Sequence, residues 1–160
     1  MSRAQNLPRW VYRLFNLPRR LVRFGFGQKV GPPLLILTTN GRRSGLPRET
    51  PLQYELIDGV YYAGSMRGDR ADWYRNILAD PHVLLRVGDN QFPALAETIE
   101  NSEQVMDFLK YRLQRSPRMI GAILRADGFQ GDTEDDAALR RYAQGLTIVS
   151  LRPAPEPETP

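Results

Sequence analysis

Cysteine is absent from the 160-residue chain, and histidine occurs once, as His82. Disulfides and thiolate chemistry are therefore excluded, which fits a reducing cytoplasm. A soft transition-metal site needs several cysteine or histidine ligands, so we expect no metal centre. A Ser-His-Asp triad would have to use His82, which lies in a strand-like run with no nucleophile motif beside it.

Long apolar runs are also missing. No stretch reaches the ~18 consecutive apolar residues of a membrane span. We expect no signal peptide, because arginines interrupt the apolar residues at the start of the chain. The composition, with 41% apolar and 25% charged residues, is ordinary for a soluble globular protein, and with the lack of cysteine we expect a cytoplasmic location.

Acidic residues are missing from the first 48 positions, and nearly all basic residues of the chain are arginine rather than lysine. The basic residues that precede the first acidic one are Arg3, Arg9, Arg13, Arg19, Arg20, Arg23, Lys29, Arg42, Arg43 and Arg48. Arginine makes planar, bidentate contacts to phosphate and carboxylate, so this bias favours an anionic ligand. Genomic base composition explains an arginine bias equally well.

The first 33 residues of the chain are expected to form an N-terminal unit. Residues 5–24 have apolar residues three or four apart with arginines between them, which predicts an amphipathic helix. This helix either packs on its own domain or lies at a membrane interface or partner surface. Residues 25–33 form a Gly/Pro hinge, so we assign residues 1–33 to the N-terminal helix and hinge.

The remaining chain predicts one α+β domain over residues 34–151, followed by a disordered tail over 152–160. Short turns separate consecutive strands at 34–39, 50–57, 60–65, 83–87 and 91–100, with one short helix at 73–79. Helices follow from residue 101, and a last strand covers 146–151. Consecutive antiparallel strands favour a closed or split β-barrel over a doubly wound sheet. The dinucleotide-binding and Walker A motifs are missing.

Two loops at strand ends carry the candidate site. The first is TTNGRRSGLPRETPL, residues 38–52, in which two glycines permit close approach of a ligand. Its candidate anion-binding residues are Arg42, Arg43, Ser44 and Arg48. The second is GSMRGDRADWYRN, residues 64–76, which adds hydroxyl, cationic and aromatic groups. If the loops converge, the site suits a planar cofactor with an anionic tail; otherwise each is a solvated loop.

The ordered motifs of these loops resemble the deazaflavin-dependent nitroreductase family. The resemblance covers about residues 34–100, through TTNGRRSGLPRETPL, DGVYYAGS and ADWYRNILADPHVLLRVG. It implies a split β-barrel of the flavin-reductase type and coenzyme F-420, an 8-hydroxy-5-deazaflavin with a polyanionic phosphate and oligoglutamate tail.

The resemblance also implies roles for individual residues. Arg42, Arg43, Ser44 and Arg48 would hold the anionic tail. The ring would be lined by Thr50, Pro51, Ser65, Met66, Arg67 and Gly68. Trp73, Tyr74 and Asn76 would shape the adjoining wall, although Trp73 also suits the core and Asn76 a local backbone hydrogen bond.

The implied reaction is hydride transfer from reduced F-420 to a quinone, enone or nitro-type acceptor, with Ser65 or Tyr74 as proton relay. A quinone acceptor would give the 5–24 helix a role at the membrane. The alternatives are an FMN or other ligand-binding barrel without turnover, and a basic nucleic-acid-binding protein. The strands lack interleaved aromatic and basic residues, which argues against nucleic acid. Pairing into a homodimer is expected by analogy with such barrels.

Overall fold

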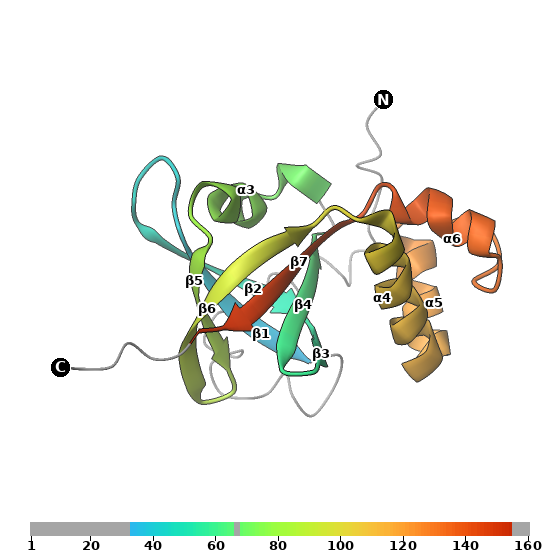
Figure 1. Cartoon of the computed structure of the whole chain (residues 1–160), viewed down its shortest axis with the longest axis horizontal. Coiled ribbons are helices and arrows are strands. Elements are labelled where there is room, and N and C mark those ends of the chain that lie inside the picture. Colours follow the sequence, from blue (N-terminus) through green and yellow to red (C-terminus); the bar gives the residue numbers. More distant parts are fainter. Residues whose placement is uncertain (1–32, 66–67, 155–160) are drawn as a thin grey trace.

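The computed structural model describes residues 33–65 and 68–154 (Figure 1). The predicted N-terminal helix over 5–24 and its hinge, except Pro33, lie outside the described residues. Met66 and Arg67, both assigned to the cofactor site from the sequence, also lie outside them, as do residues 155–160 of the predicted tail.

The described chain contains seven strands, one short 3₁₀ helix and four α-helices. The strands are β1 Leu34–Asn40, β2 Pro47–Gln53, β3 Glu55–Ile57, β4 Val60–Ser65, β5 His82–Val87, β6 Asn90–Ile99 and β7 Thr147–Pro153. The helices are η1 Gly68–Arg70, α3 Asp72–Ala79, α4 Ser102–Arg115, α5 Pro117–Ala126 and α6 Asp136–Ala143.

All seven strands join one antiparallel sheet in the order β2-β1-β5-β6-β7-β4-β3. The sheet curls so far that β2, at one edge, comes against β4 near the other edge. The β3–β4 hairpin turns at Asp58 and Gly59, whose φ angles of 49° and 78° are both positive. Asp-Gly is the pair that such a two-residue turn favours, so the hairpin predicted there is confirmed.

The inner face of the curled sheet forms the first hydrophobic core. Alternate residues of the strands point into it, among them Leu37, Leu85 and Leu151, all fully buried. Helix α3 closes one end of this barrel by adding Trp73 and Ile77 to the same core. Trp73 is therefore a core residue, which is one of the two roles expected for it from the sequence.

A second core lies between the helices and the outer face of the sheet. Helices α4, α5 and α6 stand beside the barrel in Figure 1, and their apolar side chains enclose Ile148 of β7. Because Val149 and Leu151 face the first core, strand β7 is covered on both sides. No helix among the described residues is long and apolar enough to cross a membrane.

Several element boundaries differ from the sequence prediction. Helix α3 begins at Asp72, one residue before the predicted start at 73, and its cap is Ala71. Helix α6 begins at Asp136, where Asp135 accepts the capping bond from the Ala137 amide. Strand β7 pairs with β6 as far as Pro153, so the barrel extends two residues beyond the predicted boundary at 151.

Candidate functional site

The arginine-rich loop between β1 and β2 is an ordered turn. The Gly41 amide donates to the Leu46 carbonyl at 2.9 Å, and the Gly45 amide donates to the Gly41 carbonyl at 2.7 Å. A Cβ at Gly41 would lie 2.7 Å from Ser44 Oγ, so a side chain there would displace the turn. Gly45 has a φ of 66°, which disfavours other residues. Ser44 Oγ accepts from the Leu46 amide at 3.3 Å, so its hydroxyl helps to hold the turn.

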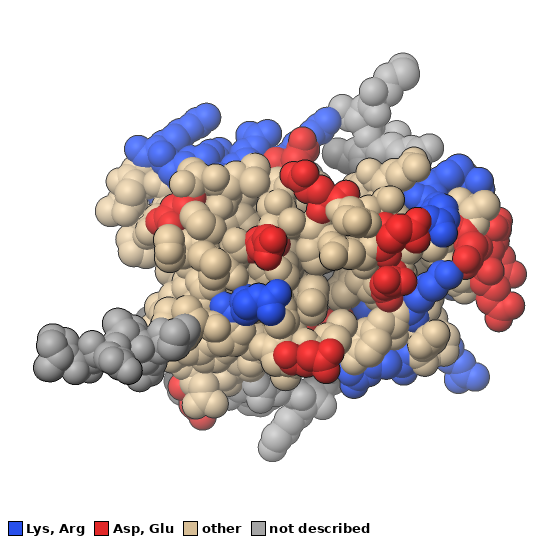
Figure 2. All heavy atoms as spheres, in the orientation of Figure 1, with Lys and Arg blue, Asp and Glu red and all other residues tan. Residues whose placement is uncertain are grey.

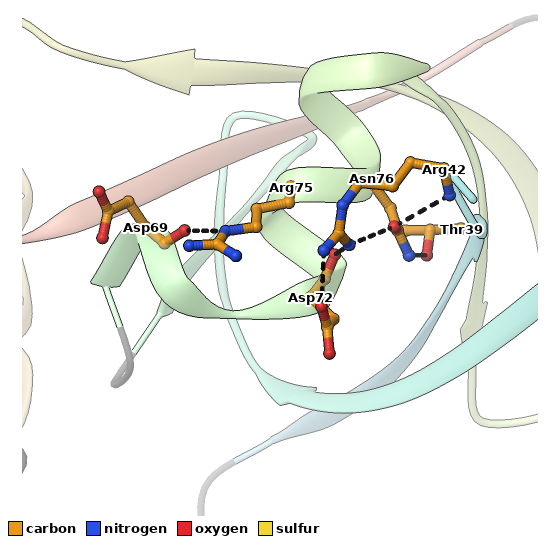
Figure 3. A network of polar contacts seen from close by, with 6 residues as sticks. All are labelled: Thr39, Arg42, Asp69, Asp72, Arg75 and Asn76. Atoms are coloured by element: carbon orange, nitrogen blue, oxygen red, sulfur yellow. Dashed lines mark hydrogen bonds and ion pairs between the residues drawn. The ribbon is translucent and has the colours of Figure 1, made fainter.

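Arg42 ties this loop to helix α3. Its Nη2 donates to Asp72 Oδ1 at 2.9 Å, and its Nη1 lies 3.3 Å from the Asp72 carbonyl oxygen and 3.0 Å from Asn76 Oδ1 (Figure 3). The Arg42 amide donates to the same Asn76 oxygen at 3.2 Å. The two loops predicted to converge are therefore in direct contact, and Arg42 uses its guanidinium inside the protein.

Asn76 is the buried centre of this network. Only 3% of its surface is exposed, and its Nδ2 donates to Thr39 Oγ1 at 3.0 Å. One side chain thus links the end of β1, the arginine loop and α3 (Figure 3). A buried amide is stable when its groups are paired, as they are here. The simpler expectation for Asn76 was a local hydrogen bond to the backbone. Its side chain instead contacts residues more than 30 positions away.

Arg43 and Arg48 differ from Arg42 because both are exposed. Neither makes an ion pair or a side-chain hydrogen bond within the described part of the chain. Figure 2 shows basic side chains along the edge of the molecule where Figure 1 draws the β1–β2 hairpin and α3. Arg70 on η1 and Arg75 on α3 are also exposed, and both lie at the end of the barrel that α3 closes. These cations can meet an anion without first breaking a side-chain ion pair.

Ser65 lies at the end of β4, where the chain turns toward η1 and α3. Its Oγ donates to the Gly68 carbonyl at 2.7 Å, and the side chain is 6% exposed. Gly68 has a φ of 58°, which glycine accepts without strain. Ser65 pairs across the sheet with Thr147 of β7. The hydrogen bond from Ser65 to the Gly68 carbonyl closes the turn after β4, and it uses the only proton of the Ser65 hydroxyl.

Trp73 and Tyr74, which were expected to shape a wall of the site, are neighbours on α3. Trp73 and Tyr74 meet edge to face, with ring centroids 6.1 Å apart. Trp73 is buried, whereas Tyr74 is half-buried and packs at the margin of the first core. Partial burial raises the pKa of Tyr74, and the negative charges of Glu100 and Asp69 raise it further. Its phenol therefore keeps its proton at neutral pH.

Thr50 and Pro51 lie in β2, half-exposed and opposite Leu37 and Ile36 of β1. The sequence analysis did not assign Thr39 or Asp72 to the site, although both contact its central network. A threonine at the end of a buried strand and an aspartate in the first turn of a helix are both common, so neither stood out. Their contacts with Asn76 and Arg42 appear only in the folded chain.

The curled sheet, the closing helix and the loop between β1 and β2 define a barrel protein with an arginine-rich loop at one end. A model of the F420H(2)-dependent quinone reductase family matches residues 6–119. The chain belongs to this family. The predicted resemblance to F-420-dependent reductases is thereby confirmed.

Individual relatives agree with the family. The chain is 32% identical over 72 residues to the F420H(2)-dependent quinone reductase Rv1261c of Mycobacterium tuberculosis, covering 43% of this chain and 48% of the relative. It thus spans about half the length of that curated relative. Rv3178 of the same species, a candidate F420H(2)-dependent quinone reductase, is 25% identical over 135 residues, 82% of this chain and 99% of the relative.

The fold is shared with solved structures. The F420-H2 dependent reductase FDR-A superposes with a TM-score of 0.51 at 22% identity, covering 77% of this chain and 99% of that one. This likeness concerns the fold, and the predicted split β-barrel is confirmed.

Proposed function

We propose that the protein is an F-420-dependent reductase that transfers a hydride from the reduced deazaflavin to a quinone-type acceptor. The observation that carries the proposal is the contact of Arg42 with Asp72 and Asn76. This contact places the arginine loop beside the α3 segment, at the same end of the barrel as Ser65. Membership of the quinone reductase family supports the reaction class.

The residues at this end fit the proposed cofactor. Its tail is polyanionic, and Arg43 and Arg48 offer two exposed guanidinium groups that bind carboxylates or phosphates in a bidentate way. Ser44 would act mainly by shaping the turn, because its oxygen already accepts from Leu46. Arg42 would position the loop rather than hold the tail itself.

The proposed ring site lies between β2 and the β4–α3 segment. Thr50 and Pro51 would line this site from β2. Ser65 at the end of β4 and Gly68 at the start of η1 would line it from the other side. Met66 and Arg67, between them in the chain, are also proposed to line it but lie outside the described residues. Trp73, Tyr74 and Asn76 would form the α3 wall.

The bound reduced cofactor supplies a hydride that, with one proton, converts a quinone to a quinol and leaves the cofactor oxidised. The chain has to orient the acceptor, exclude water and deliver the proton. Tyr74 is the better placed of the two proposed proton donors, because its phenol makes no hydrogen bond with the other described residues. Ser65 would have to break its bond to the Gly68 carbonyl before it could donate.

Fluorescence titration of the purified full chain with F-420 tests the proposal. We expect saturable binding at micromolar cofactor, and Arg43→Ala and Arg48→Ala each to weaken it by up to about fivefold, because an ion pair made by an exposed arginine contributes up to about 1 kcal/mol. Arg141→Ala on α6 is the matched control, since that arginine is also exposed but lies in the helical layer. The losses should shrink as salt is added.

The outcomes separate the proposal from its alternatives. Loss of affinity in Arg141→Ala equal to that in Arg43→Ala would indicate nonspecific attraction. Bound FMN in the purified protein, with no saturable F-420 binding, would favour the FMN barrel. A cytoplasmic location, membrane contact through residues 5–24 and pairing into a homodimer stay predictions that these titrations do not address.

A further inference from the structure

Thr147 is a second hydroxyl residue at the end of the barrel where Ser65 lies. It begins β7 and stands directly opposite Ser65 of β4 in the antiparallel register. Side chains of directly opposed residues lie on the same face of a sheet, with Cβ atoms ~5 Å apart. The two hydroxyl groups are therefore neighbours at the mouth of the barrel.

The direction of the Thr147 side chain follows from its strand. Val149 and Leu151, two and four residues along β7, both belong to the core inside the barrel. Ile148, between them, belongs instead to the core under the helices. Because side chains alternate along a strand, Thr147 faces the barrel interior rather than the helical layer.

Among the described residues, the Thr147 hydroxyl has no hydrogen-bond partner, whereas that of Ser65 has one. Ser65 uses its proton on the Gly68 carbonyl, at 2.7 Å. Thr147 is half-buried and makes no side-chain hydrogen bond in the part of the chain that the structure describes. A Cβ built on Gly68 would lie 4.0 Å from Thr147 Oγ1, so this oxygen stands close to a residue without a side chain. Within the described residues, the hydroxyl of Thr147 is therefore a donor that the fold itself does not use.

We propose that the Thr147 hydroxyl donates a hydrogen bond to a carbonyl oxygen of the planar ligand bound at this end of the barrel. This inference rests on the proposed function. It adds a positioning residue that lies more than 70 positions beyond the two loops of the site. The carbonyl belongs either to the cofactor ring or to the quinone acceptor, because both present this group.

Two substitutions separate this role from a structural one. Thr147→Val keeps the shape and the β-branch that a strand favours but removes the hydroxyl. Thr147→Ser keeps the hydroxyl but removes the β-branch. A ligand contact makes the valine variant the weaker binder, whereas a purely structural threonine makes the serine variant the less stable protein. Ser150→Ala is the matched control, since it removes a hydroxyl from the opposite face of the same strand.

The measurements are the F-420 dissociation constant by fluorescence titration, the KM for a water-soluble quinone, and the Tm. For Thr147→Val we expect a five- to tenfold rise in one of the two ligand constants, because a net hydrogen bond contributes about 1 kcal/mol. Thr147→Ser and Ser150→Ala should stay within about twofold of the wild type.

A rise in the dissociation constant assigns the bond to the cofactor, and a rise in KM alone assigns it to the acceptor. If both constants are unchanged in Thr147→Val while the wild type binds F-420 saturably, the inference is overturned and the proposed function stands. If the wild type itself shows no saturable binding, the proposed function falls and takes this inference with it.

Discussion

Replacing Asn76 with alanine should loosen the arginine loop from the barrel. The side chain is 3% exposed and contacts three other groups. It donates to Thr39 Oγ1 at 3.0 Å, and it accepts from the Arg42 amide at 3.2 Å and from Arg42 Nη1 at 3.0 Å. Alanine removes all three bonds and leaves the buried Thr39 hydroxyl, which is 1% exposed, without its amide partner.

The expected loss can be estimated from these contacts. A typical net hydrogen bond contributes about 1 kcal/mol, and leaving a buried polar group unpaired adds a further penalty of about 1 kcal/mol or more. With three bonds lost and one such penalty, the sum for Asn76→Ala is about 4 kcal/mol. In a chain of this size each kcal/mol lowers the Tm by about 2 to 4 °C, so we expect a fall of roughly 10 °C.

Denaturant unfolding of three variants tests this reasoning. Asn76→Asp keeps an acceptor for Arg42 and lets the Thr39 hydroxyl donate instead, so it should lose less stability than Asn76→Ala. Arg75→Ala is the control from the same helix, because Arg75 is exposed and donates only to the Asp69 carbonyl. If Asn76→Ala costs no more than Arg75→Ala, Asn76 does not hold the loop, and the inferred role of the network is wrong.

Two further predictions concern the helical layer. Burial raises the pKa of Asp127 more than its bond from Tyr142 lowers it, so the folded state loses stability as the pH rises through that raised pKa. Asp127→Asn should therefore be more stable than the wild type at pH 7, and the Tm difference should vanish near pH ~3, below the ordinary aspartate pKa of ~3.9, where both side chains are neutral; an equal difference at both pH values would contradict this. Glu55 pairs with Arg112 at 3.1 Å between β3 and α4, with both side chains 17% exposed. Glu55→Gln should cost about 1 to 2 kcal/mol by denaturant unfolding, because it removes the charge facing a partly buried guanidinium, whereas Glu134→Gln on the surface should cost almost nothing.

Local patterns predicted much of this fold because they act over a few residues. The Asp58-Gly59 turn requires two positive φ angles, which this pair tolerates well, so the hairpin could be placed in advance. Helices are expected from residue 101, and Asn101 caps α4 by accepting from the Glu103 amide. The order of short strands and turns likewise indicated an antiparallel barrel.

Contacts between distant segments could not be predicted in the same way. Nothing in the local sequence shows that Arg42 binds residues 30 and 34 positions further along the chain. The start of α6 is ambiguous from the sequence because Asp132, Asp135 and Asp136 all suit a helix beginning, and the observed cap is Asp135. Thr147 escaped notice because a threonine at the start of a strand is ordinary until its opposite neighbour is known.

The three arginines of the first loop are alike in the sequence but not in the structure. Arg42 binds Asp72, whose side chain is 81% exposed, and an ion pair so close to water stabilises little by itself. Its bonds with buried Asn76 are therefore the stronger part of the attachment. A loop fixed by an amide keeps its position at high salt, whereas anion binding by exposed guanidinium groups weakens there. The position of the loop thus depends on Arg42, whereas attraction of an anion depends on Arg43 and Arg48. Added salt should weaken anion binding and leave the position of the loop unchanged.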